Sequence, residues 1–567
     1  MMKNLLLYFA LFFISKVNGI CIITDVGKLK CWGYNGNGDL GYENKISYGS
    51  EPFQMGDNLT YVDLGTDVLA KSMCDGGDMK CVVTTEGKVK CWGYNTWGSL
   101  GLGLPHNTKI GDKNGDMGDN LPYINLGTNV RVKKIACGYT HVCVITNDDK
   151  VKCWGDNYKG QLGLGDRVTR GIEEGEMGDN LPYVDLDNEK VKDVDVIEGK
   201  TCVVLYSGKV KCWGADFSEN RIGDKPGDMG ANLTAINLGT NVSVIEIQMG
   251  RHACILTDKG KVKCWGYNPL GSLGLGDTIN RNEASEMGDN LPFLDFGENV
   301  LVKQLSVGYE NSCVVTFKGE TKCWGKNNFG FIDHPSVPIP EYESGRLSHE
   351  DGFTNFTNIG DQNYEMGDYL LPLYVDDTLP YSVSVSRLIY CIAYISKVKC
   401  WGDNWMGGLG LGDQIDRHHS EDTDWIELGT NINLKNINDI TIANVSPTNT
   451  PSKSPTTGTP TNSPLKSPTP VQNTKDKTIV FKNDFVIGIH DTISFKYSIC
   501  TLLSNVLELK CGETLVINTI KSGSIIVEYT IHSNEDEFEI NQDELDDMIK
   551  QSDNEEIKIL QIKKNKN

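Results

Sequence analysis

The sequence predicts an all-β fold built from seven copies of one antiparallel unit, and two observations carry this prediction. The tripeptide Cys-Trp-Gly recurs seven times along the 567-residue chain, at intervals of 52 to 77 residues. Between the copies, short alternating apolar runs are interrupted by Gly, Asn and Asp, which is typical of strands and turns rather than of helices. Such a period indicates a repeat architecture. The repeats are marked by Trp32, Trp92, Trp154, Trp213, Trp265, Trp324 and Trp401.

The first segment, residues 1–19, has the pattern of a secretory signal peptide. Lys3 precedes the apolar run LLLYFALFFI, and small residues follow near Gly19. The run is short for a membrane span, and no later stretch of about 18 apolar residues appears. We therefore expect a secreted or extracellular protein without a transmembrane segment beyond the signal peptide. An uncleaved signal anchor is the alternative.

Composition narrows the partner class. The chain is 39% apolar and 23% charged, as in folded globular proteins. Its 18 cysteines, an even number, predict disulfides in an exported protein. The net charge of -22 repels phosphate backbones, so we expect a protein partner and disfavour nucleic acid.

Cysteine spacing predicts a hairpin before each Cys-Trp-Gly. In six units a second cysteine lies ten positions earlier, so direct opposition across two strands leaves a three-residue loop. The third loop position should be left-handed and favour Gly. That position holds Gly27, Gly87, Asp149, Gly208, Gly260 and Gly319. The six expected disulfides are Cys21–Cys31, Cys81–Cys91, Cys143–Cys153, Cys202–Cys212, Cys254–Cys264 and Cys313–Cys323.

The seventh unit departs from this spacing. Cys391 and Cys400 are nine residues apart, and the implied two-residue loop of Ile395 and Ser396 lacks turn chemistry. We still expect this pair to bond, because directly opposed cysteines lie within bridging distance. Zinc binding is disfavoured for all these pairs, since zinc motifs have closer spacing.

The ends of the repeat region predict a closed ring. The first unit begins at Cys21 without the strand that precedes the hairpin elsewhere, for example in residues 132–143. A strand within residues 436–443 could supply it, which would remove the open sheet edges and make a seven-bladed β-propeller. The alternative, an open solenoid, requires polar capping units that the sequence lacks.

Residues 91–103, CWGYNTWGSLGLG, and 153–166, CWGDNYKGQLGLGD, resemble the regulator-of-chromosome-condensation repeat. The resemblance extends over residues 20–445 and implies a seven-bladed propeller. Unit four loses the LGLG turn, and unit six carries an insertion at residues 331–365. A long loop on a rigid scaffold is a candidate for interaction, and a tolerated surface insertion is the alternative.

A linker and a small domain follow the repeats. Residues 446–475 form a linker whose first part, 446–470, consists largely of Ser, Thr and Pro and cannot build a core. In residues 476–567 we expect the order strand, helix, strand, strand, helix, strand, with helices at 491–508 and 542–552. This order predicts a small α+β domain of ferredoxin-like type and resembles the SEA-like modules of extracellular proteins. Cys500 and Cys511 should pair within it.

Several residues carry weaker hypotheses. Cys74 and Cys137 occupy similar positions in neighbouring units, as either an inter-blade disulfide or two buried thiols. His141 and His252 favour a structural role over catalysis. N-glycosylation is permitted at Asn58, Asn232, Asn241 and Asn355, and more weakly at Asn444.

The acidic turns allow either calcium binding or local backbone capping. These turns contain Asp57, Asp119, Asp179, Asp289 and Asp368 in the Met-Gly-Asp motif, and Asp166, Asp277 and Asp413 after Leu-Gly.

The sequence contains no nucleophile, phosphate-loop or zinc-protease motif, so we expect neither enzymatic activity nor a cofactor. The family resemblance implies three roles: exchange factor for a small GTPase, module beside ubiquitin-ligase domains, or secreted binding protein. We expect a non-enzymatic extracellular or surface-associated protein-binding module. Guanine-nucleotide exchange is the first alternative. A glycan-binding lectin, suggested by Trp97 and Trp405, is the second.

Overall fold

In a computed structural model of the protein, the chain divides into two units, residues 1–438 and 439–567. In the first, the structure describes residues 19–434 apart from 218–219, 328–331, 333–357, 374, 376–379, 381, 395, 421–422 and 431. In the second, it describes the backbone of four strands. Among these described residues, no helix has the length and apolar character needed to cross a bilayer.

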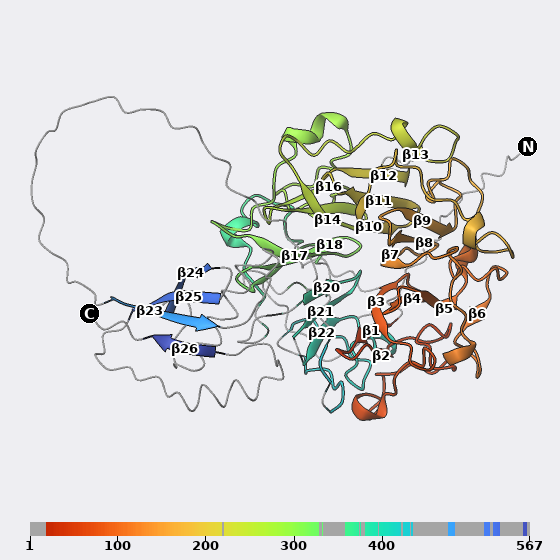
Figure 1. Ribbon diagram of the computed structural model, residues 1–567, viewed down its shortest axis with the longest axis horizontal. Helices are drawn as coiled ribbons and strands as arrows, with labels where there is room; N and C mark the ends of the chain where they lie inside the picture. Colours follow the sequence, from red (N-terminus) through yellow and green to blue (C-terminus); the bar gives the residue numbers. More distant parts are fainter. Residues whose placement is uncertain are drawn as a thin grey trace, which may run out of the picture. The chain divides into compact units, whose positions relative to one another are not determined.

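The first unit contains seven antiparallel sheets, and each sheet holds one Cys-Trp-Gly repeat, as the all-β prediction requires. Figure 1 shows them in chain order, from β1 and β2 in red to β20–β22 in teal. The strands are β1 (Ile20–Ile23) and β2 (Leu29–Trp32); β3 (Ala70–Asp75), β4 (Met79–Thr84), β5 (Val89–Tyr94) and β6 (Lys109–Ile110); β7 (Val132–Cys137), β8 (His141–Thr146) and β9 (Val151–Gly155); β10 (Val191–Ile197), β11 (Lys200–Leu205), β12 (Val210–Ala215) and β13 (Arg221–Ile222); β14 (Val244–Met249), β15 (His252–Thr257) and β16 (Val262–Gly266); β17 (Val302–Val307), β18 (Asn311–Thr316) and β19 (Thr321–Gly325); β20 (Ser382–Val385), β21 (Ile389–Ala393) and β22 (Val398–Gly402).

The hairpin register follows the cysteine spacing. In every unit the two hairpin cysteines are directly opposed across their strands, with Cα atoms 4.1 to 4.2 Å apart. The third loop position has a positive φ in all six three-residue loops, from 64° at Asp149 to 80° at Gly319. The cost of this backbone conformation explains why five of these six positions hold Gly.

The core lies in the joints between successive sheets. Each repeat tryptophan is buried, and five of them donate a hydrogen bond from Nε1 to a backbone carbonyl of the neighbouring unit. Trp92, for example, donates to Asp39 O at 3.0 Å. The indole therefore fills the joint and also satisfies a loop carbonyl that would otherwise be buried without a partner.

A buried lysine precedes every Cys-Trp-Gly and ties each joint together. Lys90 Nζ donates to Leu64 O of the preceding unit at 2.6 Å and to Gly118 O of its own unit at 2.9 Å. Desolvation lowers the pKa of Lys90, and Asp119 partly opposes this shift. Lys30, Lys152, Lys263 and Lys322 also bridge two carbonyls.

The Asp of the Met-Gly-Asp motif makes a further hydrogen-bonded link across the same joints, which we call the staple. Asp119 accepts hydrogen bonds from the backbone N and the Oγ1 of Thr66, both at 2.7 Å. Asp57, Asp179 and Asp289 bind a threonine of the preceding unit in the same way. These Met-Gly-Asp carboxylates thus bind a neighbouring unit rather than capping their own backbone, and calcium binding stays a prediction.

One joint departs from this pattern on both sides. Ala231 replaces the staple aspartate in unit four, and Asp187 and Asn188 replace the Gly-Thr that supplies the donor in unit three. Lys211 pairs there with the Glu189 carboxylate at 2.6 Å instead of bridging two carbonyls. The joint between units three and four therefore lacks both the aspartate that accepts the staple hydrogen bonds and the threonine that donates them.

The seventh sheet packs against the first. Asp25 N donates to Asn433 O at 2.9 Å, and Thr24 forms an antiparallel bridge with Leu434. Trp32 Nε1 donates to Gly408 O at 3.2 Å, within a cluster of buried residues from both ends of the repeat region. Within the described residues, Asn433 and Leu434 make the backbone contacts with the first sheet. The strand expected within residues 436–443 lies outside the described residues.

The second unit contains β23 (Thr474–Phe481), β24 (Leu515–Lys521), β25 (Ile525–His532) and β26 (Ile559–Lys563). They form one antiparallel sheet in the order β24-β25-β23-β26. The expected helices at 491–508 and 542–552 lie outside the described residues, as do Cys500, Cys511 and the linker 446–470. The ferredoxin-like assignment therefore stays a prediction.

Replacing Lys152 by Met should destabilise the first unit by about 2–4 kcal/mol, because two buried carbonyls lose their donor. The matched control is Lys150→Met, two residues earlier on an exposed side chain, for which we expect a change below about 1 kcal/mol. Urea unfolding followed by tryptophan fluorescence measures both values. Equal losses in the two variants would show that the carbonyl bridge contributes nothing specific.

Candidate functional site

The loops between the first and second strands of the second to seventh sheets form a common edge, which we call the turn face. These loops cover residues 75–79, 137–141, 197–200, 249–252, 307–311 and 385–389. Each is tied to the end of the third strand, as where Lys326 N donates to Glu310 O at 2.9 Å. Because the strand order repeats, all six loops lie at the same edge of their sheets. The turn face is therefore held on rigid elements.

Two arginines and two tyrosines from three consecutive units meet on this face. The Arg251 guanidinium lies 5.0 Å from the Tyr309 ring centroid, and the Arg387 guanidinium lies 5.2 Å from it. Arg251 also lies 5.1 Å from the ring of Tyr267. These distances are within the range of cation–π attraction. We call Arg251, Tyr267, Tyr309 and Arg387 the arginine–tyrosine cluster.

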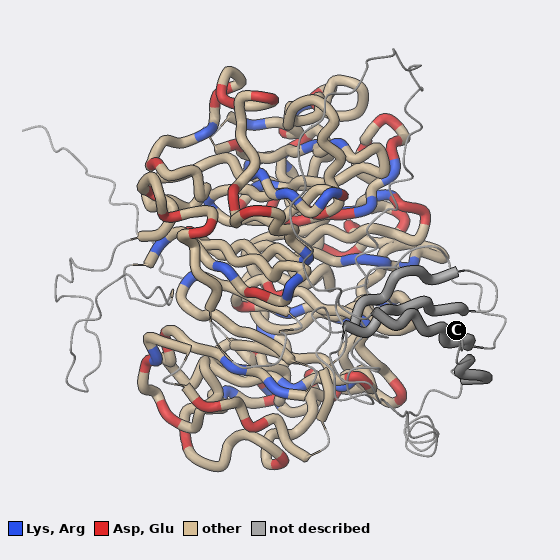
Figure 2. The backbone as a smooth tube through the Cα atoms, turned by 90° about the vertical axis from the view of Figure 1, so that its left-hand side faces the viewer, with Lys and Arg blue, Asp and Glu red and all other residues tan. Residues whose placement is uncertain are grey.

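One buried carboxylate supports this cluster. Glu310 is 7% exposed and pairs with Arg251 Nη1 at 3.1 Å and Lys326 Nζ at 3.0 Å. Arg387 has no carboxylate partner among the described residues. The cluster and its support thus hold three cations and one anion, and Asp403, whose backbone N donates to Leu388 O in the loop of Arg387, adds a second carboxylate nearby. The balance is still positive, on a chain of net charge -22. Figure 2 shows how widely Asp and Glu are distributed over the rest of the first unit.

The loops of units two to four give the same face a different charge. Asp75 and Glu198 are exposed, and Asp78 accepts a hydrogen bond from the Tyr139 hydroxyl at 2.9 Å. Desolvation and the neighbouring Asp78 carboxylate raise the pKa of Tyr139, which therefore stays protonated and donates. Asp75 is paired with Lys80 at 2.7 Å, so the turn face is acidic at units two to four mainly through Asp78 and Glu198, and it is basic at units five to seven.

The first strands of units four and five carry three acids near Lys134, which lies on the first strand of unit three. Lys134 on β7 pairs with Asp193 on β10, while Asp193 and Asp195 accept hydrogen bonds from backbone amides of β14 at 3.0 and 2.7 Å. Desolvation raises the pKa of Asp195 to about 7. Desolvation and the nearby Asp193 raise the pKa of Glu246 to about 7 as well. Three carboxylates thus share one ammonium group across three sheets.

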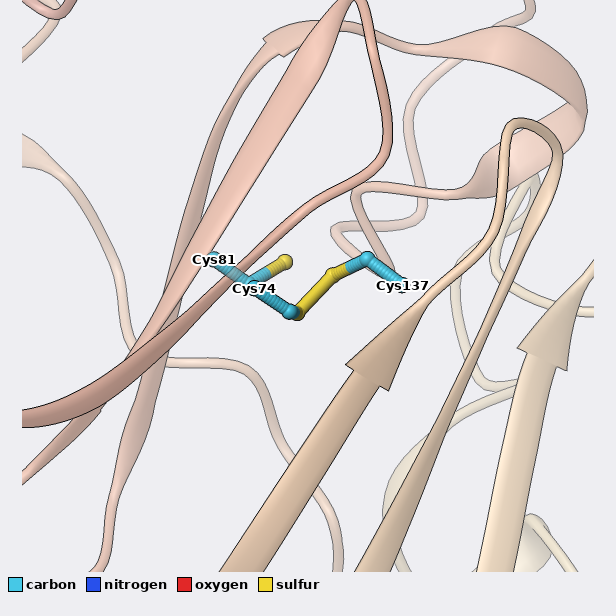
Figure 3. Close-up of side chains that lie close together, drawn as sticks. All are labelled: Cys74, Cys81 and Cys137. Atoms are coloured by element: carbon cyan, nitrogen blue, oxygen red, sulfur yellow. A yellow bond between two sulfur atoms is a disulfide. The ribbon is translucent and has the colours of Figure 1, made fainter. Parts of the chain in front are cut away.

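The predicted cysteine pairs lie at bonding distance. The seven hairpin pairs and Cys74–Cys137 form eight disulfides, and no described cysteine is free. Cys74–Cys137 joins units two and three. Figure 3 shows this disulfide beside Cys81, and the three sulfur atoms lie within 4.8 Å of one another. Because all three sulfurs are in disulfides, they lack the thiolate charge that a metal ligand needs.

The remaining predicted residues have structural contacts. His141 Nε2 lies 2.9 Å from Thr201 Oγ1, and His252 Nε2 lies 2.7 Å from Ser312 Oγ. Both rings are fully buried, and desolvation lowers the pKa of each to about 3, so they remain neutral. Trp97 stacks on His106, and Trp405 stacks on Tyr34.

The other predicted surface positions are distributed over several units. Asn58, Asn232 and Asn241 are exposed. Asn355, Asn444 and most of the insertion, residues 333–357, lie outside the described residues. Asp166, Asp277 and Asp413 each pair with an arginine four residues later.

Sequence reasoning missed the bridging lysines and the arginine–tyrosine cluster. A signal for the lysines exists, because all seven Cys-Trp-Gly copies follow a Lys. For the cluster, the signal is weaker: an aromatic or arginine side chain follows the first loop residue in Gly138-Tyr139, Gly250-Arg251, Gly308-Tyr309 and Ser386-Arg387.

Comparison with known families places part of this chain. Residues 86–145 match the Regulator of chromosome condensation (RCC1) repeat. Residues 132–161, 250–272 and 302–330 match a second description of the same repeat. These segments match the RCC1 repeat, as the resemblance predicted, and they cover less than half of the chain.

Two curated relatives each align with less than half of this chain. It is 29% identical over 258 residues to the ultraviolet-B receptor UVR8 of Arabidopsis thaliana, which covers 45% of this chain and 52% of the receptor. It is 28% identical over 265 residues to the human E3 ubiquitin-protein ligase HERC2, covering 45% of this chain and 5% of the ligase. The chain thus spans about half the length of the plant relative and a small part of the human one.

Solved structures add the fold. A chain in the crystal structure of Kap60 bound to yeast RCC1 (Prp20) has a TM-score of 0.50 and 15% sequence identity, over 75% of this chain and 87% of that chain. At this identity the likeness concerns the fold alone, and it shows a propeller fold.

The buried acids should make stability depend on pH. Because the folded-state pKa of Asp195 is raised from 3.8 to about 7, its stabilising contribution is complete below pH 3.8 and is lost as the pH rises through about 7. Asp195→Asn should therefore raise the melting temperature relative to the wild type more at about pH 8 than at about pH 5. The control is Asp187→Asn, at an exposed carboxylate. A difference that does not change with pH would contradict the raised pKa.

Proposed function

We propose that this chain is a non-enzymatic, extracellular or surface-associated protein-binding β-propeller whose turn face contacts the partner. One observation carries the proposal: consecutive units present Arg251, Tyr309 and Arg387 together on rigid loops. Arginine and tyrosine are enriched among residues that dominate binding energy at protein interfaces. Loops on a rigid scaffold lose little entropy on binding.

The proposed ring has seven blades. Seven sheets follow one another, and the contacts of Thr24 with Leu434 and of Trp32 with Gly408 join the last to the first. A closed ring leaves fewer free sheet edges for unspecific association than an open array of sheets does. The partner would then meet a single continuous face.

The cysteines support the extracellular part of the proposal. Eight disulfides in one unit require an oxidising compartment, because cytosolic thiols are kept reduced. Asn58, Asn232 and Asn241 are exposed and lie in N-glycosylation sequons, so they would be accessible for glycosylation in that compartment.

Two other functions remain alternatives. Guanine-nucleotide exchange would require a cytosolic protein and nucleotide release from a small GTPase. Glycan binding has one observation in its favour: the Trp97 side chain is 47% exposed. Its ring, however, is stacked on His106 with centroids 4.4 Å apart, so one ring face is covered.

Affinity capture from extracellular medium tests the proposal. The disulfide-bonded chain is compared with the triple variant Arg251→Ala, Tyr309→Ala, Arg387→Ala, and the captured proteins are identified by mass spectrometry. We expect the specific partner to be depleted about tenfold or more by the triple variant, because interface arginines and tyrosines often contribute the equivalent of a tenfold change each.

The matched control is the triple variant Lys28→Ala, Tyr61→Ala, Lys88→Ala. It also removes two cations and one tyrosine, and Lys28 Nζ lies 5.0 Å from the Tyr61 ring. Lys28 and Lys88 lie at hairpin loops, at the end of the hairpin strands away from the turn face, and Tyr61 lies in the connection before β3. Capture that is unchanged by the turn-face variant, or lost equally in both variants, would refute binding through this face.

A further inference from the structure

The arginine–tyrosine cluster also indicates which chemistry its partner presents, an inference that rests on the proposed protein-binding function. The relevant feature is its unbalanced charge. Arg251 and Lys326 share the single carboxylate of Glu310, and Arg387 has none among the described residues. A ligand that supplies carboxylates would balance the remaining positive charge.

The geometry suits a carboxylate. Arg251 and Arg387 both lie about 5 Å from the Tyr309 ring, so this ring holds two guanidinium groups close together. The Arg251 side chain is 32% exposed, and Arg387 is half-buried. A planar guanidinium in such a position can donate two parallel hydrogen bonds to one carboxylate, and the neighbouring ring excludes water from the contact.

The rest of the face limits the ligand's size and charge. Asp78 and Glu198, from units two and four, form most of the acidic part of the turn face, because the Asp75 carboxylate is paired with Lys80 at 2.7 Å. A long polyanion, such as a nucleic acid, that crossed the whole face would meet these carboxylates and be repelled. A short acidic segment confined to units five to seven avoids them.

We propose that the arginine–tyrosine cluster binds a short acidic peptide segment of a protein partner through its carboxylates. Arg251 and Arg387 each hold a carboxylate, and Tyr309 contacts the backbone or an apolar side chain between them. Glu310 keeps Arg251 in position but does not touch the ligand.

Fluorescence anisotropy with a fluorescein-labelled octaglutamate peptide tests this inference on the intact, disulfide-bonded chain. At about 50 mM salt, where charge attraction is weakly screened, we expect saturable binding that weakens at about 300 mM. The double variant Arg251→Gln, Arg387→Gln should weaken binding about tenfold or more. Lys28→Gln, Lys88→Gln, which removes the same charge elsewhere, should change it less than about twofold. Octaglutamine should not bind.

Circular dichroism melting confirms that both double variants are folded. Absent octaglutamate binding, or equal weakening by the two double variants, would overturn the acidic-peptide inference. If partner capture still depended on Arg251, Tyr309 and Arg387 in that case, protein binding through the turn face would stand and only the partner's chemistry would be wrong. If capture did not depend on them either, both proposals would fail.

Discussion

The structure of the first unit depends on the need to satisfy buried carbonyl groups where one sheet meets the next. The lysine before each Cys-Trp-Gly does this with its ammonium group, as Lys90 does for Leu64 and Gly118. The tryptophan beside it serves a third carbonyl, and the Asp119 carboxylate fixes the loop of the preceding unit through Thr66. An ammonium group is costly to bury, so it is retained only because several dipoles converge on it.

This constraint also explains the irregular joint and the position of the binding face. Between units three and four, the staple loses donor and acceptor together, and Lys211 takes a carboxylate in place of carbonyls. The lysine bridge recurs in units one, two, three, five and six, whereas Lys399 in unit seven donates to Ser420 O of its own unit. At the loop tips, the Arg251 backbone N also donates to Tyr309 O at 2.9 Å, so the arginine–tyrosine cluster itself helps to join units five and six.

Much of the fold could be predicted from the sequence, because cysteine spacing reports strand register directly. The ten-residue interval implied the loop length, and positive φ at Gly27 and Asp149 follows from it. The lysines escaped notice because a charged residue in an alternating strand suggests a solvent-facing position. The arginine–tyrosine cluster could not be predicted, since Arg251, Tyr309 and Arg387 are 58 and 78 residues apart and meet only through the ring. The C-terminal helices lie outside the described residues and stay predictions.

The position of the disulfides has a mechanical consequence. Each hairpin disulfide closes a loop of about ten residues within one sheet, and Cys74–Cys137 links two sheets that follow one another in the sequence. No described disulfide crosses the contact between the first and seventh sheets, where Thr24 meets Leu434 by backbone pairing. If the proposed ring opened at this contact, each hairpin disulfide would still hold the two strands of its hairpin in register.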